Sequence, residues 1–300
     1  MKGIVNIYKE KDYTSHDVVN IVRKKLGKQF KVGHTGTLDP NATGVLPICI
    51  GKATKIADYI MGSTKEYIAE VILGVKTDTY DNTGNILEEK TVSASRDEII
   101  NAVNSFRGEI FQTPPMYSAI KVNGKKLYEL ARKGIEVERK KRDVTIYKIE
   151  ILEFFDDARF SIKVLCSKGT YIRSLCNDIG EALNTCACMG DLVRTKTGNF
   201  LIEDSVTLEK FSEIVENDEL KNTIIPIEEV LNEYKRVVVR EELNKILYNG
   251  NKVNCKYVIY GEENKEIEHG ESVLVYDFEN NLVGIFKRED YFLIPLTMLV

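Results

Sequence analysis

An aspartate and a histidine share one glycine-rich segment near the N-terminus, and chemistry is most expected there. The segment runs from Gly33 to Pro47 and reads GHTGTLDPNATGVLP, with His34 after the first glycine and Asp39 directly before Pro40. Glycine permits backbone dihedrals that other residues avoid, and a residue before proline is biased toward an extended form. The sequence therefore predicts a stiff loop that presents the Asp39 carboxylate. An ionised carboxylate can act as a nucleophile or as a general base.

An ordinary turn is the alternative for this segment, because Asp-Pro pairs and glycines are common in turns. The segment holds more polar side chains than a plain turn of this length needs: His34, Thr35, Thr37, Asp39 and Thr43. It contains neither the Gly-x-x-x-x-Gly-Lys-Ser/Thr pattern nor the Gly-x-Gly-x-x-Gly pattern, so a known phosphate-binding loop is not indicated.

Arg173 is a second candidate, because it opens a predicted helix. The apolar residues of that helix recur at helical spacing: Ile172, Leu175, Cys176, Ile179 and Leu183. A cation in the first turn faces the positive end of the helix dipole, which costs from a few tenths to about one kcal/mol. A nearby anion would offset this cost, and Asp39 is the natural candidate. An exposed Arg173 without such a partner is the equal alternative.

Charge is unevenly spread along a chain of 300 residues with a formal net charge of −4. Residues 1–55 carry ten basic and four acidic side chains, and residues 121–142 carry nine basic and three acidic ones. Each of the two segments therefore has a net charge of +6. Residues 201–234 carry two basic and ten acidic side chains, a balance of −8. A dipolar molecule with a basic face that concentrates a polyanion is the simplest interpretation, and solvated surface charge is the alternative.

The length predicts one large domain over residues 1–232 and a smaller one over residues 235–300. The smaller domain alternates short apolar segments with Gly and Asn turns, which predicts a β-rich unit with one short helix near 241–248. No apolar run approaches the roughly 20 residues that span a bilayer, and residues 1–7 read as a short strand. We therefore expect a cytoplasmic protein with no membrane partner.

Six cysteines are spread over both predicted domains, at positions 49, 166, 176, 186, 188 and 255. Without an export signal, reduced thiols are expected. A zinc site is the alternative, but Cys-x-Cys is not the usual ligand pairing, and Cys176 falls on the apolar stripe of a helix. We expect buried free thiols and no metal.

Helices and strands alternate around the candidate residues. Ser15 is expected to cap a helix over 16–26, and Ser95 with Glu98 forms a capping-box pattern before a helix over 96–106. Strands are predicted at 45–50, 67–73, 144–153 and 159–166, whereas 77–84 and 112–119 read as surface or site loops. This alternation indicates an α+β fold with a mixed sheet.

The Gly33–Pro47 segment resembles the catalytic motif of the TruB family of pseudouridine synthases. Further motifs match in the family's order: Ser15-His16-Asp17, Gly51-Lys52-Ala53-Thr54-Lys55, Lys65-Glu66-Tyr67, Thr77-Asp78-Thr79, Pro115-Met116-Tyr117-Ser118-Ala119, Gly124-Lys125-Lys126-Leu127-Tyr128-Glu129 and Cys166-Ser167-Lys168-Gly169-Thr170-Tyr171-Ile172-Arg173. The resemblance implies the pseudouridine synthase fold, with a mixed, largely antiparallel sheet flanked by helices and a PUA-like RNA-binding domain at the C-terminus. It also implies isomerisation of uridine 55 in the T loop of tRNA to pseudouridine, without a cofactor.

The resemblance assigns roles to five residues. Asp39 matches the catalytic aspartate, Arg173 the arginine that pairs with it, and Tyr67 the tyrosine that stacks on the target base. His34 matches the histidine that helps to hold the RNA loop open, and Leu192 matches the apolar residue that lines the pocket. These matches predict one site assembled from distant parts of the chain.

The reaction calls for such groups. Replacing an N1–C1′ bond by a C5–C1′ bond requires uracil to turn in place, so the base must leave the stack. An aromatic side chain such as Tyr67 holds a ring by its face and tolerates that rotation. Arg173 is expected to keep Asp39 ionised and oriented. Whether Asp39 acts as nucleophile or as base stays open.

RNA contacts are expected from Lys125 and Lys126 in the second basic segment, and tRNA is expected to bind through its T-arm stem-loop. Lys9 falls where the family commonly has Lys-Pro, but Glu10 replaces the proline, so its role stays open. We expect a monomer without an obligate protein partner. The alternatives are a guide-RNA-dependent synthase of the archaeal and eukaryotic kind, or an RNA-binding folding helper with secondary catalysis.

Overall fold

The larger part of the molecule is built on one mixed sheet. The computed structural model describes residues 2–122, 124–260 and 266–300, so Met1 of the predicted N-terminal strand lies outside the described residues. Within these ranges the sheet has nine strands: β1 (Gly3–Lys9), β2 (Val32–His34), β3 (Thr43–Ile50), β4 (Lys65–Leu73), β7 (Gly108–Gln112), β10 (Arg142–Phe154), β11 (Arg159–Cys166), β12 (Ala187–Thr197) and β13 (Phe200–Leu201). Their order is β1-β3-β12-β4-β11-β10-β7, with β2 beside β3 and β13 beside β12.

The predicted mixed, largely antiparallel sheet is confirmed. Among the described strands, β12 and β3 form the sheet's one parallel pair, through Val193 opposite Thr43 and Arg194 opposite Gly44. Gly44 has φ 104°, and a Cβ there would lie 2.2 Å from the Arg194 carbonyl oxygen, so only glycine fits. The end of the Asp39 loop is thereby joined closely to β12.

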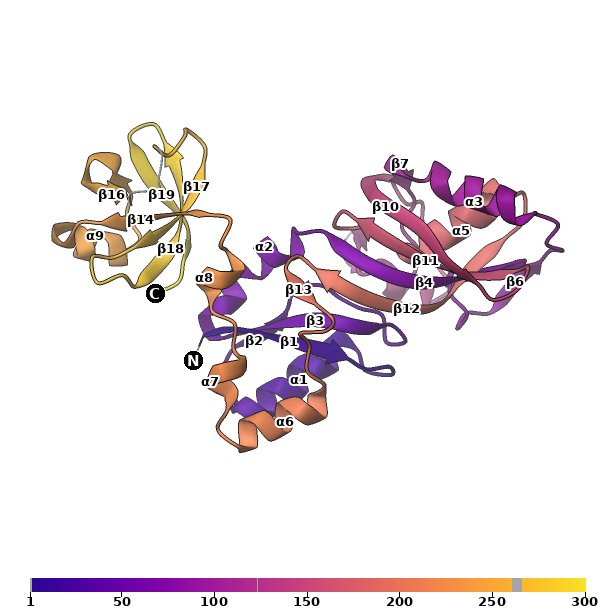
Figure 1. The fold of residues 1–300 in the computed structure, drawn as a ribbon, viewed down its shortest axis with the longest axis horizontal. Coiled ribbons are helices and arrows are strands. Elements are labelled where there is room, and N and C mark those ends of the chain that lie inside the picture. Colours follow the sequence, from indigo (N-terminus) through magenta and orange to yellow (C-terminus); the bar gives the residue numbers. More distant parts are fainter. Residues whose placement is uncertain (1, 123, 261–265) are drawn as a thin grey trace.

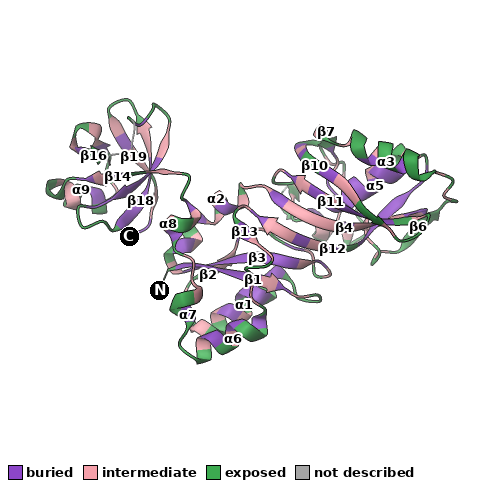
Figure 2. Ribbon diagram, in the orientation of Figure 1, coloured by how far each residue is buried: buried purple, intermediate pink, exposed green. Residues whose placement is uncertain are grey.

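Helices cover the sheet on two sides (Figure 1). Apolar residues of α3 (Arg96–Ser105) and α5 (Ile172–Ala182) form one buried cluster with β4, β10, β11 and β12. Apolar residues of α1 (Ser15–Leu26), α6 (Leu208–Glu216) and α7 (Leu220–Thr223) form another with β1 and β3. Most residues of β1 and β3 are buried, β4 and β12 combine buried with intermediate residues, and outward turns of α3 and α6 are exposed (Figure 2). The catalytic candidates lie beside the first cluster.

Thr14, and not Ser15, caps α1. The Thr14 hydroxyl accepts a hydrogen bond from Asp17 N at 3.1 Å, and the Asp17 carboxylate accepts from Thr14 N at 2.9 Å. The predicted Ser15 cap is wrong because Ser15 Oγ is turned inward, where it accepts from Leu38 N at 2.8 Å and donates to Leu38 O at 3.1 Å. The Ser95–Glu98 capping box at α3 is confirmed.

Shorter elements connect these layers. The 3-10 helix η1 (Gly51–Ile56) and α2 (Ala57–Met61) lead from β3 to β4, and hairpins are formed by β5 (Val75–Thr77) with β6 (Ile86–Glu89) and by β8 (Lys121–Val122) with β9 (Lys125–Lys126). The helices α4 (Leu127–Ala131) and α8 (Ile227–Val230) follow β9 and α7. In the described ranges, no helix combines the length and apolar character that crossing a membrane requires.

The C-terminal part is β-rich, as predicted, and compatible with a PUA-like domain. Its described strands form a six-stranded sheet: β14 (Lys235–Val239), β15 (Val253–Asn254), β16 (Val258–Tyr260), β17 (Ser272–Tyr276), β18 (Leu282–Glu289) and β19 (Phe292–Met298). The predicted short helix consists of η2 (Glu241–Leu243) and α9 (Asn244–Tyr248), and η3 (Cys255–Tyr257) follows β15. Its Leu274, Ile285 and Leu299 share a buried cluster with the first part of the chain, and Lys55 Nζ donates to Met298 O at 2.7 Å.

The six cysteines are free thiols, as predicted. Five are buried and Cys255 is half-buried. Burial raises the pKa of the Cys49 thiol to about 12 and that of Cys166 to about 11, so both stay protonated at neutral pH.

Candidate active site

Asp39 lies in the loop between β2 and β3, and the residues on both sides of it are fixed. Leu38 exchanges two hydrogen bonds with the Ser15 hydroxyl, and Pro40 O accepts one from Asp12 N at 3.0 Å. Leu38 is buried, whereas 40% of the Asp39 side chain is exposed. The loop therefore presents the carboxylate to a substrate, as the glycine and proline pattern predicts.

Lys9 provides a further anchor for this loop. It is fully buried, and its Nζ donates to Glu10 O at 2.9 Å, Tyr13 O at 2.6 Å and Pro40 O at 2.9 Å. Burial lowers the pKa of Lys9 to about 8. Pro40 directly follows Asp39 in the sequence, so the hydrogen bond from Lys9 to Pro40 O holds the backbone next to the Asp39 carboxylate. Lys9, whose role the sequence left open, thus joins the end of β1 to the loop that carries Asp39.

The ion pair predicted between Asp39 and Arg173 is present. Arg173 is in the first turn of α5, its side chain is 7% exposed, and its Nη2 lies 3.0 Å from Asp39 Oδ2 and 3.2 Å from Asp39 Oδ1. The guanidinium also donates to Tyr117 O at 2.8 Å and Thr79 O at 3.2 Å. These bonds fix the plane of the guanidinium against the carboxylate.

Burial is the largest influence on Asp39, and it raises the pKa of that carboxyl group above its ordinary value. Asp81 raises the pKa further, whereas Arg173 and Lys9 lower it. The net direction differs from the expectation that Arg173 governs this ionisation. The same surroundings that hold the carboxylate in place also remove part of the water around it.

Asp81 is a site residue that the sequence analysis did not single out. Its Oδ2 lies 3.5 Å from Arg173 Nη1, and its side chain is 14% exposed. Its Oδ1 accepts from Thr79 Oγ1 at 2.8 Å and from Thr83 N at 3.1 Å. The polar 77–84 segment was the available signal, but it did not distinguish Asp81 from Asp78, which bonds to Asn85 instead.

Tyr67 and Leu192 lie on the neighbouring strands β4 and β12. Arg194 is opposite Tyr67 in the ladder between β12 and β4, and Leu192 is opposite Ala69. Tyr67 packs against the buried cluster that contains Leu192 and Leu38. Burial raises the pKa of the Tyr67 phenol, while Arg194 lowers it through charge and a hydrogen bond. The phenol is therefore protonated at neutral pH.

Arg194 is a second residue that the sequence analysis missed. It is 1% exposed, and it donates from Nε to Val45 O at 2.7 Å and from Nη2 to Gly36 O at 3.2 Å. It thus holds the glycine-rich loop on both sides of Asp39 and also reaches Tyr67. An arginine within an alternating strand ordinarily indicates an exposed position, so no sequence signal separated it from its neighbours.

The His34 ring is neutral at neutral pH, because its surroundings lower its pKa. Burial lowers its pKa most, and the charges of Arg194 and His16 lower it further. Nδ1 of His34 accepts from Gly36 N at 3.3 Å, which leaves the ring proton on Nε2. A neutral ring fits contact with RNA bases and gives no support to proton transfer by His34.

Lys125 and Lys126 lie on the β8–β9 hairpin. Lys125 is exposed, and half-buried Lys126 places Nζ 3.3 Å from Tyr128 Oη. The hairpin is joined to the segment that bonds Arg173, because Tyr128 N donates to Ser118 O at 3.1 Å.

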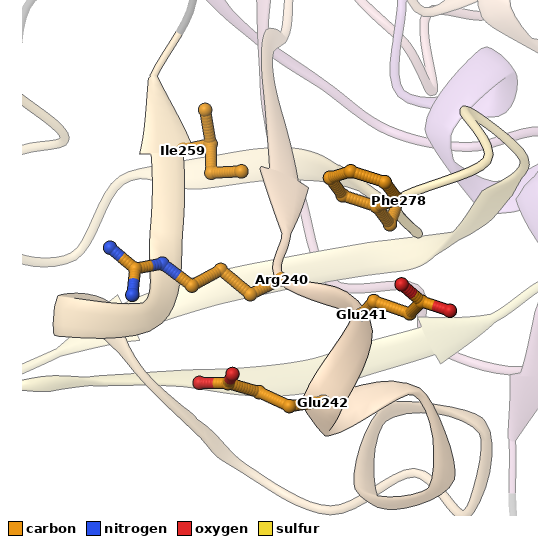
Figure 3. A pocket seen from close by; sticks show the side chains of 5 residues that line it. All are labelled: Arg240, Glu241, Glu242, Ile259 and Phe278. Atoms are coloured by element: carbon orange, nitrogen blue, oxygen red, sulfur yellow. The ribbon is translucent and has the colours of Figure 1, made fainter.

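The C-terminal domain carries a separate depression of about 670 Å³ (Figure 3). Its lining residues follow β14 or face that segment: Arg240, Glu241, Glu242, Ile259 and Phe278. None of the predicted site residues lines it, so the depression is distinct from the Asp39 site.

Family models match the chain on both sides of Arg173. Residues 23–172 match the TruB family pseudouridylate synthase (N terminal domain), and residues 173–232 match the tRNA pseudouridylate synthase B C-terminal domain. The chain belongs to the TruB family. It is an enzyme, a tRNA pseudouridine synthase, and therefore an isomerase that acts on tRNA.

Curated relatives cover nearly the whole chain. The tRNA pseudouridine synthase B of Clostridium tetani (strain Massachusetts / E88) is 49% identical over 289 residues, which are 96% of each protein. That of Alkaliphilus oremlandii (strain OhILAs) is 47% identical over 293 residues, 97% of this chain and 95% of the relative.

Solved structures confirm the expected fold for this TruB-family chain. A chain in the crystal structure of a Cbf5-Nop10-Gar1 complex matches with a TM-score of 0.75 at 27% identity, covering 99% of this chain and 85% of that one. A chain in an H/ACA RNP bound to a substrate RNA containing 2'-deoxyuridine matches with a TM-score of 0.73 at 25% identity, with the same coverage.

Proposed function

We propose that this enzyme isomerises uridine 55 in the T-arm stem-loop of tRNA, with Asp39 as the catalytic residue. The observation that carries the assignment is the partly exposed Asp39 carboxylate, which lies 3.0 Å from the Arg173 guanidinium and whose charge raises the pKa of the Tyr67 phenol. The three side chains come from a loop, a helix and a strand far apart in the sequence. A purely structural aspartate would not need such an arrangement at an opening toward solvent.

The residues have distinct parts in the reaction. The target base leaves the RNA stack and lies against the Tyr67 ring, with Leu192 as an apolar wall and His34 against the opened loop. Asp39 acts at the ribose, as a nucleophile at C1′ or as a base on a sugar proton. The N1–C1′ bond breaks, uracil turns, the C5–C1′ bond forms, and the C5 hydrogen leaves as a proton while N1 gains one.

Arg173 holds Asp39 in the orientation that either route requires. Nη2 of Arg173 lies near both carboxylate oxygens of Asp39, and the hydrogen bonds of Arg173 to main-chain oxygens keep the guanidinium in place. Preorganised charge of this kind stabilises a transition state more than a mobile group would.

RNA binding rests on the two basic segments. Lys125 and Lys126 contact phosphates, and the C-terminal domain, residues 235–300, adds a second RNA-binding surface to the catalytic domain, residues 1–232. The enzyme works in the cytoplasm as a monomer, without guide RNA, protein partner or cofactor. Its 47–49% identity to proteins named tRNA pseudouridine synthase B supports this reading.

Asp39→Asn tests the catalytic assignment. It should abolish release of the C5 hydrogen from labelled uridine while leaving tRNA affinity nearly unchanged, because the amide keeps the shape and loses the reactive charge. Asp204→Asn removes the same charge at an exposed position and should have no effect. Turnover that persists in Asp39→Asn would refute the role of Asp39.

A guide-RNA-dependent synthase is the second candidate, because one matched solved structure is a Cbf5-Nop10-Gar1 complex and another is an H/ACA RNP bound to a substrate RNA. Incubating the purified chain with a bare tRNA transcript distinguishes the two. Pseudouridine at position 55 supports the stand-alone enzyme, and its appearance only after addition of guide RNA and partners supports the alternative. Tight tRNA binding without any pseudouridine would instead indicate a folding helper.

A further inference from the structure

Gln112 caps the helix that carries Arg173. Gln112 is the last residue of β7 and is 1% exposed. Its Nε2 donates to Tyr171 O at 2.9 Å, and its Oε1 accepts from Tyr171 N at 2.7 Å. Within the described part of the chain, the N-cap residue Tyr171 makes no side-chain capping bond of its own. The side chain of Gln112 thus pairs with the Tyr171 peptide groups as a neighbouring strand would.

The residues after Gln112 hold the same helix turn. Ser174 Oγ donates to Thr113 O at 2.7 Å, and Arg173 Nη2 donates to Tyr117 O at 2.8 Å. One irregular segment, residues 112–117, therefore contacts the backbone before Arg173, the residue after it and its guanidinium. Four hydrogen bonds from one segment fix where the guanidinium lies relative to Asp39.

We propose that Gln112 is a positioning residue for the isomerisation, acting through Arg173 on Asp39. The inference rests on the proposed function of those two residues. Glutamine suits the position because one side chain supplies both a donor and an acceptor, which carboxylate and aliphatic side chains do not. A displacement of about 1 Å at a reacting group can reduce a rate about 100-fold. Loss of the two hydrogen bonds between Gln112 and Tyr171 lets the start of α5 move and weakens the Asp39–Arg173 contact.

Gln112→Met tests the proposal, since methionine has a similar volume and neither hydrogen-bonding group. We expect kcat to fall by about 10-fold or more while KM for tRNA changes less than about 2-fold. The acid limb of kcat/KM should move to higher pH, because Arg173 is the largest influence that lowers the pKa of Asp39. A role in folding alone would leave that limb in place.

Gln112→Glu supplies a readout with the opposite sign. The ionised carboxylate can accept from Tyr171 N but cannot donate to Tyr171 O, whereas the protonated acid can do both. Activity relative to wild type should therefore rise as the pH falls, which Gln112→Met should not show. Asn6→Ala is the matched control, because Asn6 is a buried amide that bonds Leu201 O at 2.7 Å in another cluster. It should lower stability and leave the acid limb unchanged.

Assays are run below the onset of unfolding of each variant, and a crystal structure of Gln112→Met gives a readout that needs no turnover. The proposal expects the guanidinium to have left ion-pairing distance of Asp39. It is overturned by an unmoved guanidinium, or by wild-type kcat and acid limb in Gln112→Met while Asp39→Asn is inactive. Turnover that persists in Asp39→Asn would refute the proposed function instead.

Discussion

Removing the charge of Arg173 should affect stability and ionisation together. The Arg173→Gln variant loses two hydrogen bonds to main-chain oxygens and contacts with two carboxylates. Bonds from charged donors contribute about 1.5–3 kcal/mol each, and breaking a buried ion pair costs about 3–5 kcal/mol. These contributions overlap, and Asp39 is 40% exposed, so solvent screens its share. We expect the free energy of unfolding to fall by about 3 kcal/mol, mostly through the carbonyl groups and Asp81.

The activity of Arg173→Gln should depend on pH in a defined direction. Burial and Asp81 raise the pKa of Asp39, and Arg173 opposes them. Without Arg173 the pKa of Asp39 rises further, so a smaller fraction is ionised at neutral pH. The rate deficit should be about 100-fold or more at neutral pH and should shrink as the pH increases.

Release of the C5 hydrogen across the pH range, with urea unfolding at each pH, measures both effects. Lys210→Gln is a matched loss of one positive charge at an exposed i,i+3 pair, and it should leave both the stability and the pH profile nearly unchanged. An acid limb that stays in place in Arg173→Gln would show that Arg173 does not hold Asp39 in its ionised form, and the reasoning would fail.

Further predictions concern charge and capping. Asp39→Asn should not lower the melting temperature at neutral pH. Folding raises the pKa of the Asp39 carboxyl group, and such a group stabilises the native state only in acid. This stabilisation is lost as the pH rises through the folded-state pKa, so at neutral pH the variant has none to lose. Thr14→Ala should lower the free energy of unfolding by about 1 kcal/mol with activity unchanged. Because hydrogen bonds from Thr14 lower the pKa of Asp17, that deficit should shrink in urea unfolding as acid protonates Asp17. Replacing Lys125 and Lys126 by Gln should weaken tRNA binding and reduce the slope of log affinity against log salt by up to about 1.8, and an unchanged slope would remove them from the RNA interface.

Part of the sheet could be predicted, because apolar patterns located the strands β1, β3, β4, β10 and β11, whereas β2, β7, β12 and β13 were not predicted. The 159–166 strand has its predicted bounds, but β3 and β4 each begin two residues before the apolar pattern. In β4 the extra residues are Lys65 and Glu66, whose polarity hides the strand. Lys65 Nζ donates to Met61 O and Ser63 O, both at 2.6 Å, so its position is set by a turn that the local sequence does not specify.

The site residues that belong to recognisable motifs could be predicted. The Asp39–Arg173 ion pair joins two segments that the sequence had already singled out. Asp81 and Arg194 could not be recognised, because their roles arise from partners more than 90 positions away. The predicted Ser15 cap was wrong because of a nearer partner: a serine beside a threonine is an equally good cap until Leu38, 23 positions away, takes its hydroxyl.

The cations around Asp39 act mainly on the main chain. Lys9 and Arg194 donate to carbonyl oxygens of the loop that carries Asp39, and Arg173 donates to two further carbonyls. A carbonyl group orients a cation without cancelling its charge, so the loop is fixed while the site remains electropositive. Burial of a cation has a cost, which is visible in Lys9: burial lowers its pKa to about 8. An arginine keeps its proton under the same conditions. Positive charge anchored in this way opposes the rise that burial causes in the pKa of Asp39, and we expect it to attract the RNA backbone as well.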